Sequence, residues 1–197
     1  MPPTVLLICD FQAPIRALMP DKPSFDSAAS HAASLLRFAR TLGEEKVLVI
    51  HVIAGGANRT DQALYSVNPN SAIGEFMRSF PASPASPGII DILAPLPDEQ
   101  ILTRTRASVF HDTPLHSQLR SLAIRQLFLC GVATSGVVLA SFRSAIDADY
   151  EVAVVGEACA DVSREMHQAL FGYFAAKGWG GRVVSVQEAM RELQLEG

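Results

Sequence analysis

Long hydrophobic runs and clusters of positive charge are both missing from this sequence. No stretch approaches the roughly 18 to 20 consecutive apolar residues that a membrane-spanning helix needs. The 16 Lys and Arg residues are outnumbered by 20 Asp and Glu residues, which gives a formal net charge of -4. Because nucleic acids and anionic membranes are bound through basic patches, neither is an expected partner. The composition favours a small neutral or polar ligand.

Cysteine is scarce, and the chain offers no disulfide framework. Cys9, Cys130 and Cys159 are odd in number, and each lies within or at the end of an apolar run. This pattern is typical of buried thiols in a reducing compartment. The N-terminus has no basic region and only a short apolar run, so we expect no signal peptide and a cytoplasmic location.

The usual metal and nucleotide motifs are also missing. The histidines show neither H-x3-H spacing nor a nearby cysteine: His31, His51, His111, His116 and His167. We therefore expect no metal site. No G-x-G-x-x-G follows the first predicted strand, and Val137 and Val138 follow residues 131–136 where a phosphate-binding loop has Lys and Ser or Thr. No cofactor is expected.

What the chain does contain is an alternation of strand-like and helix-like segments. Strands are predicted at residues 4–9, 46–52, 100–103, 126–130, 151–155 and 182–186, and helices at 26–41, 71–80, 111–122, after 131 and at 164–177. Such alternation predicts an α/β fold with three layers, in which a six-stranded, mainly parallel sheet carries helices on both faces. The length and the 49% hydrophobic content fit a single domain over residues 1–197.

Residues 54–98 form a long, Pro-rich connection with a single predicted helix. A connection of this length in a compact domain usually has a function, so we expect it to cover a site. Its Phe76 or Tyr65 could add to an apolar wall with Phe11, Phe110 and Val137, and its Asn68 or Asn70 could offer neutral hydrogen bonds beside Gln12 and Ser135.

Two charged residues stand at the carboxyl ends of predicted strands, where α/β sheets bind ligands. Asp10 follows the first strand, and partial burial there would raise its pKa and suit it to acid or base catalysis. Arg104 follows the third strand and could meet Asp10. The alternatives are that Asp10 is a turn or capping residue and that Arg104 is solvated.

The turn GVATSG, residues 131–136, lies between the fourth strand and a helix. Backbone N–H groups at the start of a helix favour negative charge, so this turn is a candidate oxyanion site. The alternative is that Thr134 or Ser135 only caps the helix. Among the thiols, Cys159 could face the pocket, but a buried structural role is favoured for all three.

Four motifs together resemble the isochorismatase-like hydrolase superfamily of cysteine hydrolases. They are DFQ at 10–12, RTRASVF at 104–110, GVATSGVVLASFRSAIDADY at 131–150 and EACAD at 157–161, and the resemblance spans nearly the whole chain. It implies a Rossmann-like, six-stranded parallel sheet, a small-molecule substrate, and a homodimer or homotetramer. It also implies a triad of Asp, Lys and Cys and a cis peptide bond before the helix of the nucleophile.

The family positions fall on the following residues of this chain. The resemblance places the Asp at Asp10, the Lys at Arg104, the cysteine at Val137 and the cis peptide between Val132 and Ala133. It places the family's Gln at Gln12 and its S-x-F at Ser108 and Phe110. We expect these three residues, with Phe11, Thr134 and Ser135, to bind the substrate.

The chain departs from the family pattern at two of the three triad positions. Val137 has no nucleophilic atom, which closes the thioester route. Arg104 keeps the positive charge but cannot shuttle a proton, although it can hold Asp10 as a carboxylate. The isochorismatase branch protonates a vinyl ether with its Asp and needs no cysteine, but a nearby arginine opposes that protonation.

Three hypotheses follow. The first is a hydrolase that acts on a small, partly apolar molecule without a covalent cysteine intermediate. The second is a catalytically inactive relative that binds a small molecule or a partner. The third and weakest is that Cys159 or Cys130 replaces the missing nucleophile.

Overall fold

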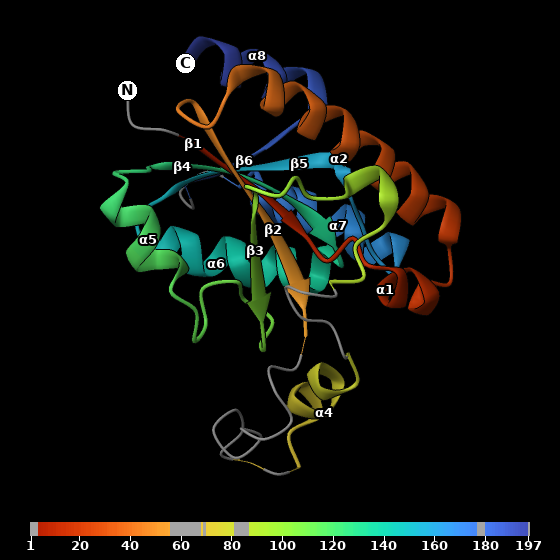
Figure 1. Ribbon diagram of the computed structural model, residues 1–197. Helices are drawn as coiled ribbons and strands as arrows, with labels where there is room; N and C mark the ends of the chain where they lie inside the picture. Colours follow the sequence, from red (N-terminus) through yellow and green to blue (C-terminus); the bar gives the residue numbers. More distant parts are fainter. Residues whose placement is uncertain (1–3, 56–67, 69, 81–86, 177–179, 197) are drawn as a thin grey trace.

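A computed structural model describes residues 4–55, 68, 70–80, 87–176 and 180–196. Its centre is one six-stranded sheet with the order β3-β2-β1-β4-β5-β6, in which every neighbouring pair of strands is parallel (Figure 1). The strands are β1 Thr4–Cys9, β2 Val47–Ala54, β3 Gln100–Arg104, β4 Gln126–Val132, β5 Glu151–Ala160 and β6 Gly181–Val184. The predicted α/β fold class is confirmed.

Helices cover both faces of the sheet. One face carries α2 (Lys22–Leu42) and α8 (Val186–Glu196), and the other carries α5 (Leu115–Ser121), α6 (Leu139–Asp147) and α7 (Arg164–Phe174) (Figure 1). Phe142 of α6 packs against Phe174 of α7 with their ring centroids 4.8 Å apart, which joins the two helices on that face. Among the described residues, no helix has the length and apolar character needed to cross a membrane.

The central strands are buried because helices lie on both sides of them. All six residues of β1 are buried, as the continuous apolar run TVLLIC predicts. On α2, small and apolar side chains recur at helical spacing and face the sheet, among them Ala29, Ala33 and Leu36. The sheet and its two helical layers thus form one continuous core.

Several element boundaries differ from the sequence expectation. Helix α2 begins at Lys22, not near Asp26, and Asp21 caps it by accepting a hydrogen bond from the Ser24 N–H at 3.1 Å. Pro23 does not prevent this start, because proline is tolerated in the first turn of a helix. Strand β5 continues five residues beyond Val155, with a register irregularity against β4.

The long connection after β2 is described in part. It contains α4 (Ala72–Arg78) and a short 3-10 helix, η2 (Asp91–Leu93). In Figure 1, α4 stands apart from both helical layers, near the end of the sheet to which β2 and β3 point. Tyr65, which was predicted to line the site, lies outside the described residues. The connection therefore reaches the carboxyl edge of the sheet, where a cover for a site is expected.

Candidate functional site

The site lies at the carboxyl edge of the sheet, beside the point where the strand order reverses. The chain runs outward from β1 to β3 on one side and from β4 to β6 on the other, so the crevice between β1 and β4 is the expected ligand position. Asp10 follows β1 there with a positive φ of 63°. A non-glycine residue in this region is uncommon and is often found at functional positions.

The close approach of β1 and β4 requires a glycine at position 131. A Cβ atom on Gly131 would lie 2.6 Å from the carbonyl oxygen of Cys9, which is too short for any real contact. The glycine of the GVATSG turn therefore lets β4 pass beside the end of β1. This brings the turn next to Asp10.

Asp10 forms a buried ion pair with Arg104, which ends β3. Arg104 Nε donates to both carboxylate oxygens, at 3.1 and 2.9 Å, and its Nη2 donates to Oδ2. Arg104 Nη1 donates to the Arg106 carbonyl oxygen at 2.6 Å and approaches the Met77 sulfur at 3.7 Å. Asp10 is 0% exposed and Arg104 is 4% exposed. The two charged groups that the sequence placed at strand ends do meet.

The pKa of the Asp10 carboxyl is raised from its ordinary value of 3.8. Burial is the main cause, and the charge and hydrogen bonds of Arg104 act in the opposite direction. The carboxyl is therefore a stronger base than a solvated aspartate. A proton can be exchanged at this position more readily than at a surface carboxylate.

A cavity of about 230 Å³ opens beside this pair. Its walls come from Ile15, Leu18 and Met19 in and after α1 (Ala13–Leu18), from Ile73, Phe76 and Met77 of α4, from Val132, Ala133, Gly136 and Val137 of the turn region, and from Arg104, Ala107 and Val162. Arg104 is the one charged residue among these. The cavity is an apolar space with a single polar contact point on its wall.

The turn that borders the cavity holds Val137, the residue at which the resemblance predicts the family's nucleophile. The peptide bond between Val132 and Ala133 is cis, where the resemblance places it, and Thr134–Val138 forms a short π-helix, η3. Val137 is 1% exposed. Its side chain can bound the cavity but cannot form a covalent bond with a substrate.

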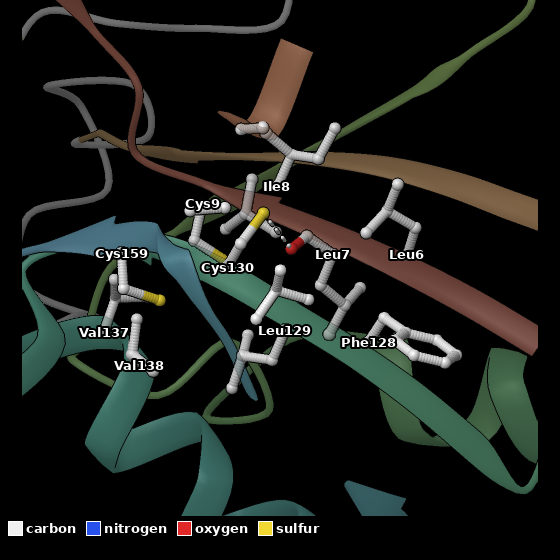
Figure 2. Close-up of a cluster of buried hydrophobic side chains, with 14 of the residues drawn as sticks. Leu6, Leu7, Ile8, Cys9, Phe128, Leu129, Cys130, Val137, Val138 and Cys159 are labelled. Atoms are coloured by element: carbon white, nitrogen blue, oxygen red, sulfur yellow. Dashed lines mark hydrogen bonds between the residues drawn. The ribbon is translucent and has the colours of Figure 1, made fainter. Parts of the chain in front are cut away.

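The cysteines are all buried and free (Figure 2). Figure 2 shows Cys9, Cys130 and Cys159 in the same apolar cluster as Val137. Burial raises the pKa of Cys9 and Cys130 well above the ordinary value, and burial raises that of Cys159 to about 12. The sequence predicted that Cys159 follows the fifth strand, but Cys159 lies within β5. Because a nucleophile requires a thiolate, this environment argues against a substitute cysteine.

Phe76 and Val137, which were expected in the apolar wall, line this cavity, but the other residues expected to bind substrate lie outside its lining. Phe11 is buried against Phe25, with ring centroids 5.7 Å apart. Gln12 is fully buried and uses its amide on the backbone: its Oε1 accepts from the Ala54 N–H at 2.8 Å, and its Nε2 donates to the carbonyl oxygens of Ala54 and Pro87 at 3.2 and 2.8 Å. Asn68 and Asn70, of the long connection, are exposed.

Ser108 and Phe110 line a separate, more open pocket beside α5 and α6. Ser108 donates to the Ser144 hydroxyl at 2.8 Å, and Phe110 stacks on Tyr150. The S-x-F segment thus attaches the chain after β3 to α6 and to the residues that follow α6.

Thr134 and Ser135 are engaged within the turn and its surroundings. The Thr134 hydroxyl donates to the Ala160 carbonyl oxygen at 3.1 Å and lies 2.8 Å from His167 Nδ1. The Ser135 N–H donates to an Asp161 carboxylate oxygen at 2.5 Å. One backbone donor of the turn is therefore already paired with a carboxylate. The side chains of Thr134 and Ser135 do not cap the helix, which was the alternative role considered for them.

Sequence reasoning missed several wall residues. The apolar residues of α1 and Val162 carried no motif, although Leu18 and Val162 are 58% and 56% exposed at the mouth of the cavity. Exposed large apolar side chains next to a strand end are the signal that could have pointed to them. Within the described ranges, no group of three or more His, Cys, Asp or Glu residues is placed to hold a metal ion.

Comparison with known proteins identifies the family. Residues 4–188 match the family model of the isochorismatase domain. A probable isochorismatase of Pseudomonas chlororaphis is 30% identical over 174 residues, which is 88% of this chain and 79% of that protein. This chain belongs to the isochorismatase family. The family consists of hydrolases that act on small molecules.

With other relatives, the match covers a smaller share of the relative's length. The phenazine biosynthesis protein PhzD of Pseudomonas fluorescens is 36% identical over 96 residues, and the match covers 49% of this chain and 46% of that protein. The chain thus matches about half of this relative. An isochorismatase family protein of Burkholderia thailandensis has the same fold, with a TM-score of 0.77 and 24% identity over 98% of this chain and 97% of that one.

Proposed function

We propose that this isochorismatase-family protein hydrolyses a small, partly apolar molecule without a covalent cysteine intermediate. The observation that carries the proposal is the buried Asp10–Arg104 pair, whose arginine lines an apolar cavity beside the turn that contains Val137. Location in the cytoplasm, a single domain, and a homodimer or homotetramer remain predictions.

In the proposed reaction, Asp10 acts as a general base. Its carboxylate takes a proton from a water molecule, and the water oxygen bonds to a substrate carbonyl carbon. The carbonyl electron pair moves to oxygen, where backbone N–H groups of Ala133 and Val137 stabilise the charge. The tetrahedral intermediate then expels its leaving group, which receives the proton from Asp10. Arg104 keeps Asp10 ionised, because an adjacent cation favours the carboxylate.

In the part of the chain that the structure describes, Arg104 lies between the cavity and Asp10. The carboxyl group is fully buried, whereas the guanidinium belongs to the cavity wall. The reaction therefore requires Arg104 to expose one oxygen of Asp10 to the attacking water. The same observation favours a second candidate function, in which the cavity binds a small molecule without converting it.

A substrate screen separates the two functions. Amides, ureides and vinyl ethers are incubated with the wild type, with Asp10→Asn, and with Glu99→Gln as a matched control that removes a buried carboxylate far from the cavity. Hydrolysis that Asp10→Asn abolishes and Glu99→Gln retains supports the proposed reaction. Hydrolysis that survives in Asp10→Asn refutes the role of Asp10. Binding without turnover in the wild type favours the second function.

A further inference from the structure

The cavity combines an apolar wall with a charged group that is already neutralised. Among its described wall residues, Arg104 carries the single formal charge, and the other wall residues are apolar or glycine. A cation in a binding pocket usually indicates an anionic ligand. Here the partner of that cation is already within the protein.

The donors of Arg104 are almost fully used. Nε and Nη2 face the carboxylate of Asp10, and Nη1 is directed at the Arg106 carbonyl oxygen and the Met77 sulfur. A guanidinium has five N–H donors, so at most one N–H, on Nη2, remains for a ligand. The pair as a whole has no net charge.

We propose that the cavity selects an uncharged molecule of about the size of one ring, with a carbonyl as its only polar group, and rejects the corresponding carboxylate. This inference rests on the proposed function in one respect, because it names the substrate class for the same site. Selection follows from the neutralised cation, since a ligand anion would lie in an apolar space next to the Asp10 carboxylate.

The volume sets the size of the ligand. Apolar cavities of about 150 Å³ hold a benzene molecule, whereas drug-sized ligands occupy roughly 300 Å³ or more. At about 230 Å³, this cavity lies between the two. A single ring or a branched chain that carries one amide, ester or ketone group fits this range.

The expected selectivity is large. Moving an ion into an apolar site without a free counter-charge is strongly unfavourable, whereas a neutral carbonyl needs one hydrogen bond. We expect the neutral form to bind about 100-fold more tightly than the anion, a conservative reading of that penalty.

The test uses pairs of probes that have nearly the same shape and differ in charge. Benzamide, cyclohexanecarboxamide and isovaleramide are titrated into the full-length wild type at neutral pH and compared with benzoate, cyclohexanecarboxylate and isovalerate. Binding is followed by calorimetry and by ligand-observed NMR, and Ala107→Trp, which fills the cavity, shows whether the signal comes from this site. Amide binding that Ala107→Trp removes, with much weaker carboxylate binding, supports the proposal. Equal or tighter carboxylate binding overturns it, and so does the failure of every amide to bind.

Two variants test the physical cause. Asp10→Asn leaves the guanidinium without its counter-charge and should invert the preference toward the carboxylates. Arg104→Met removes the cation and should keep the preference for amides. If Asp10→Asn does not fold, the wild-type titration alone still decides the proposal.

The binding result is independent of turnover. Amide selectivity without hydrolysis would leave this inference intact and remove the proposed reaction. Hydrolysis of an anionic substrate that depends on Asp10 would support the proposed reaction and overturn this inference.

Discussion

Two arginine–carboxylate pairs beside the sheet differ in how completely the carboxylate is bound. Among the charged groups that the structure describes, Asp10 pairs with Arg104 alone, at the carboxyl edge beside the cavity. Glu99, just before β3, accepts from Arg40 Nε and Nη2 at 2.8 and 2.7 Å and from the Leu96 N–H at 2.9 Å, and it lies 2.9 Å from His51 Nε2. The first pair borders a site, and the second joins α2, β2 and the start of β3.

The different surroundings move the two carboxyl pKa values in opposite directions. Burial raises the pKa of Glu99, but hydrogen bonds from Arg40, Leu96 and His51 outweigh it and lower the value from 4.5 to about 2. Burial raises the pKa of Asp10, and its single arginine partner does not fully offset this effect. A fully bound carboxylate is a structural clamp, whereas a buried one with fewer donors can exchange a proton.

The largest expected difference between the pairs is in turnover. Arg104→Met leaves burial unopposed, so the pKa of Asp10 rises further and less of the base is ionised at neutral pH. We expect kcat to fall about 100-fold, the lower end of typical general-base contributions, and the pH optimum to move upward. Arg40→Met should retain wild-type turnover. Equal losses in the two variants would contradict the distinction.

The loss of unfolding free energy should also be larger when the Asp10–Arg104 pair is disrupted than when the Glu99–Arg40 pair is disrupted. Asp10→Ala leaves a buried guanidinium with neither a counter-charge nor an acceptor oxygen, which we expect to cost about 3–5 kcal/mol of unfolding free energy. Glu99→Gln keeps an acceptor oxygen, and Arg40 is partly exposed to water, so a loss of about 1–2 kcal/mol is expected. Urea unfolding followed by circular dichroism measures both. A larger loss for Glu99→Gln would reverse the comparison.

The pH dependence of stability should have opposite signs at the two carboxyls. The pKa of Glu99 is lower in the folded chain, so its contribution is present above pH 4.5 and is lost as the pH falls toward about 2. The pKa of Asp10 is raised above 3.8, so this group binds protons more tightly in the folded chain and adds stability as the pH falls toward 3.8.

Urea titrations over this range, repeated with Glu99→Gln and Asp10→Asn, isolate each contribution. The difference between wild type and Glu99→Gln should shrink in acid, and the difference between wild type and Asp10→Asn should grow. The same sign for both would show that Arg104 lowers the pKa of Asp10 as completely as the Glu99 partners do.

The smallest expected effect concerns the missing nucleophile. Val137→Cys should make one new thiol reactive toward iodoacetamide, because Val137 borders the cavity, while the three native thiols stay unlabelled. Turnover should not increase, since Arg104 cannot accept the proton of the new thiol. Mass spectrometry after labelling measures the reaction. Labelling of Cys159 in the wild type would contradict the inert environment described above.

The strands and the meeting of Asp10 with Arg104 could be predicted because both depend on local rules. Apolar runs mark buried parallel strands, and the residues that follow neighbouring strands meet at one edge. The β1 run ends at Asp10 as predicted, and β3 extends one residue further, to Arg104.

The wall of the cavity could not be predicted because it depends on how distant segments pack. Met19 and Met77 carry no motif, yet packing of the α1 and α4 regions brings both to the site. Gln12 was expected to face the ligand from its position two residues after Asp10. The positive φ of Asp10 turns the chain there, and the Gln12 amide bonds to Ala54 instead.

The Gln12 amide also ties together the two ends of the long connection after β2. The Gln12 side chain donates to the carbonyl oxygens of Ala54, where the long connection leaves the sheet, and of Pro87, near its return. Just after Pro87, the Gly88 carbonyl oxygen accepts from the Ala13 N–H, and the Ile90 N–H donates to the Phe11 carbonyl oxygen. Because the ends of the connection are fixed, its middle can change in length or sequence at little cost to the sheet. Because Gln12 fixes both ends of the connection, we expect substitutions between those ends to leave Asp10 and Arg104 in place.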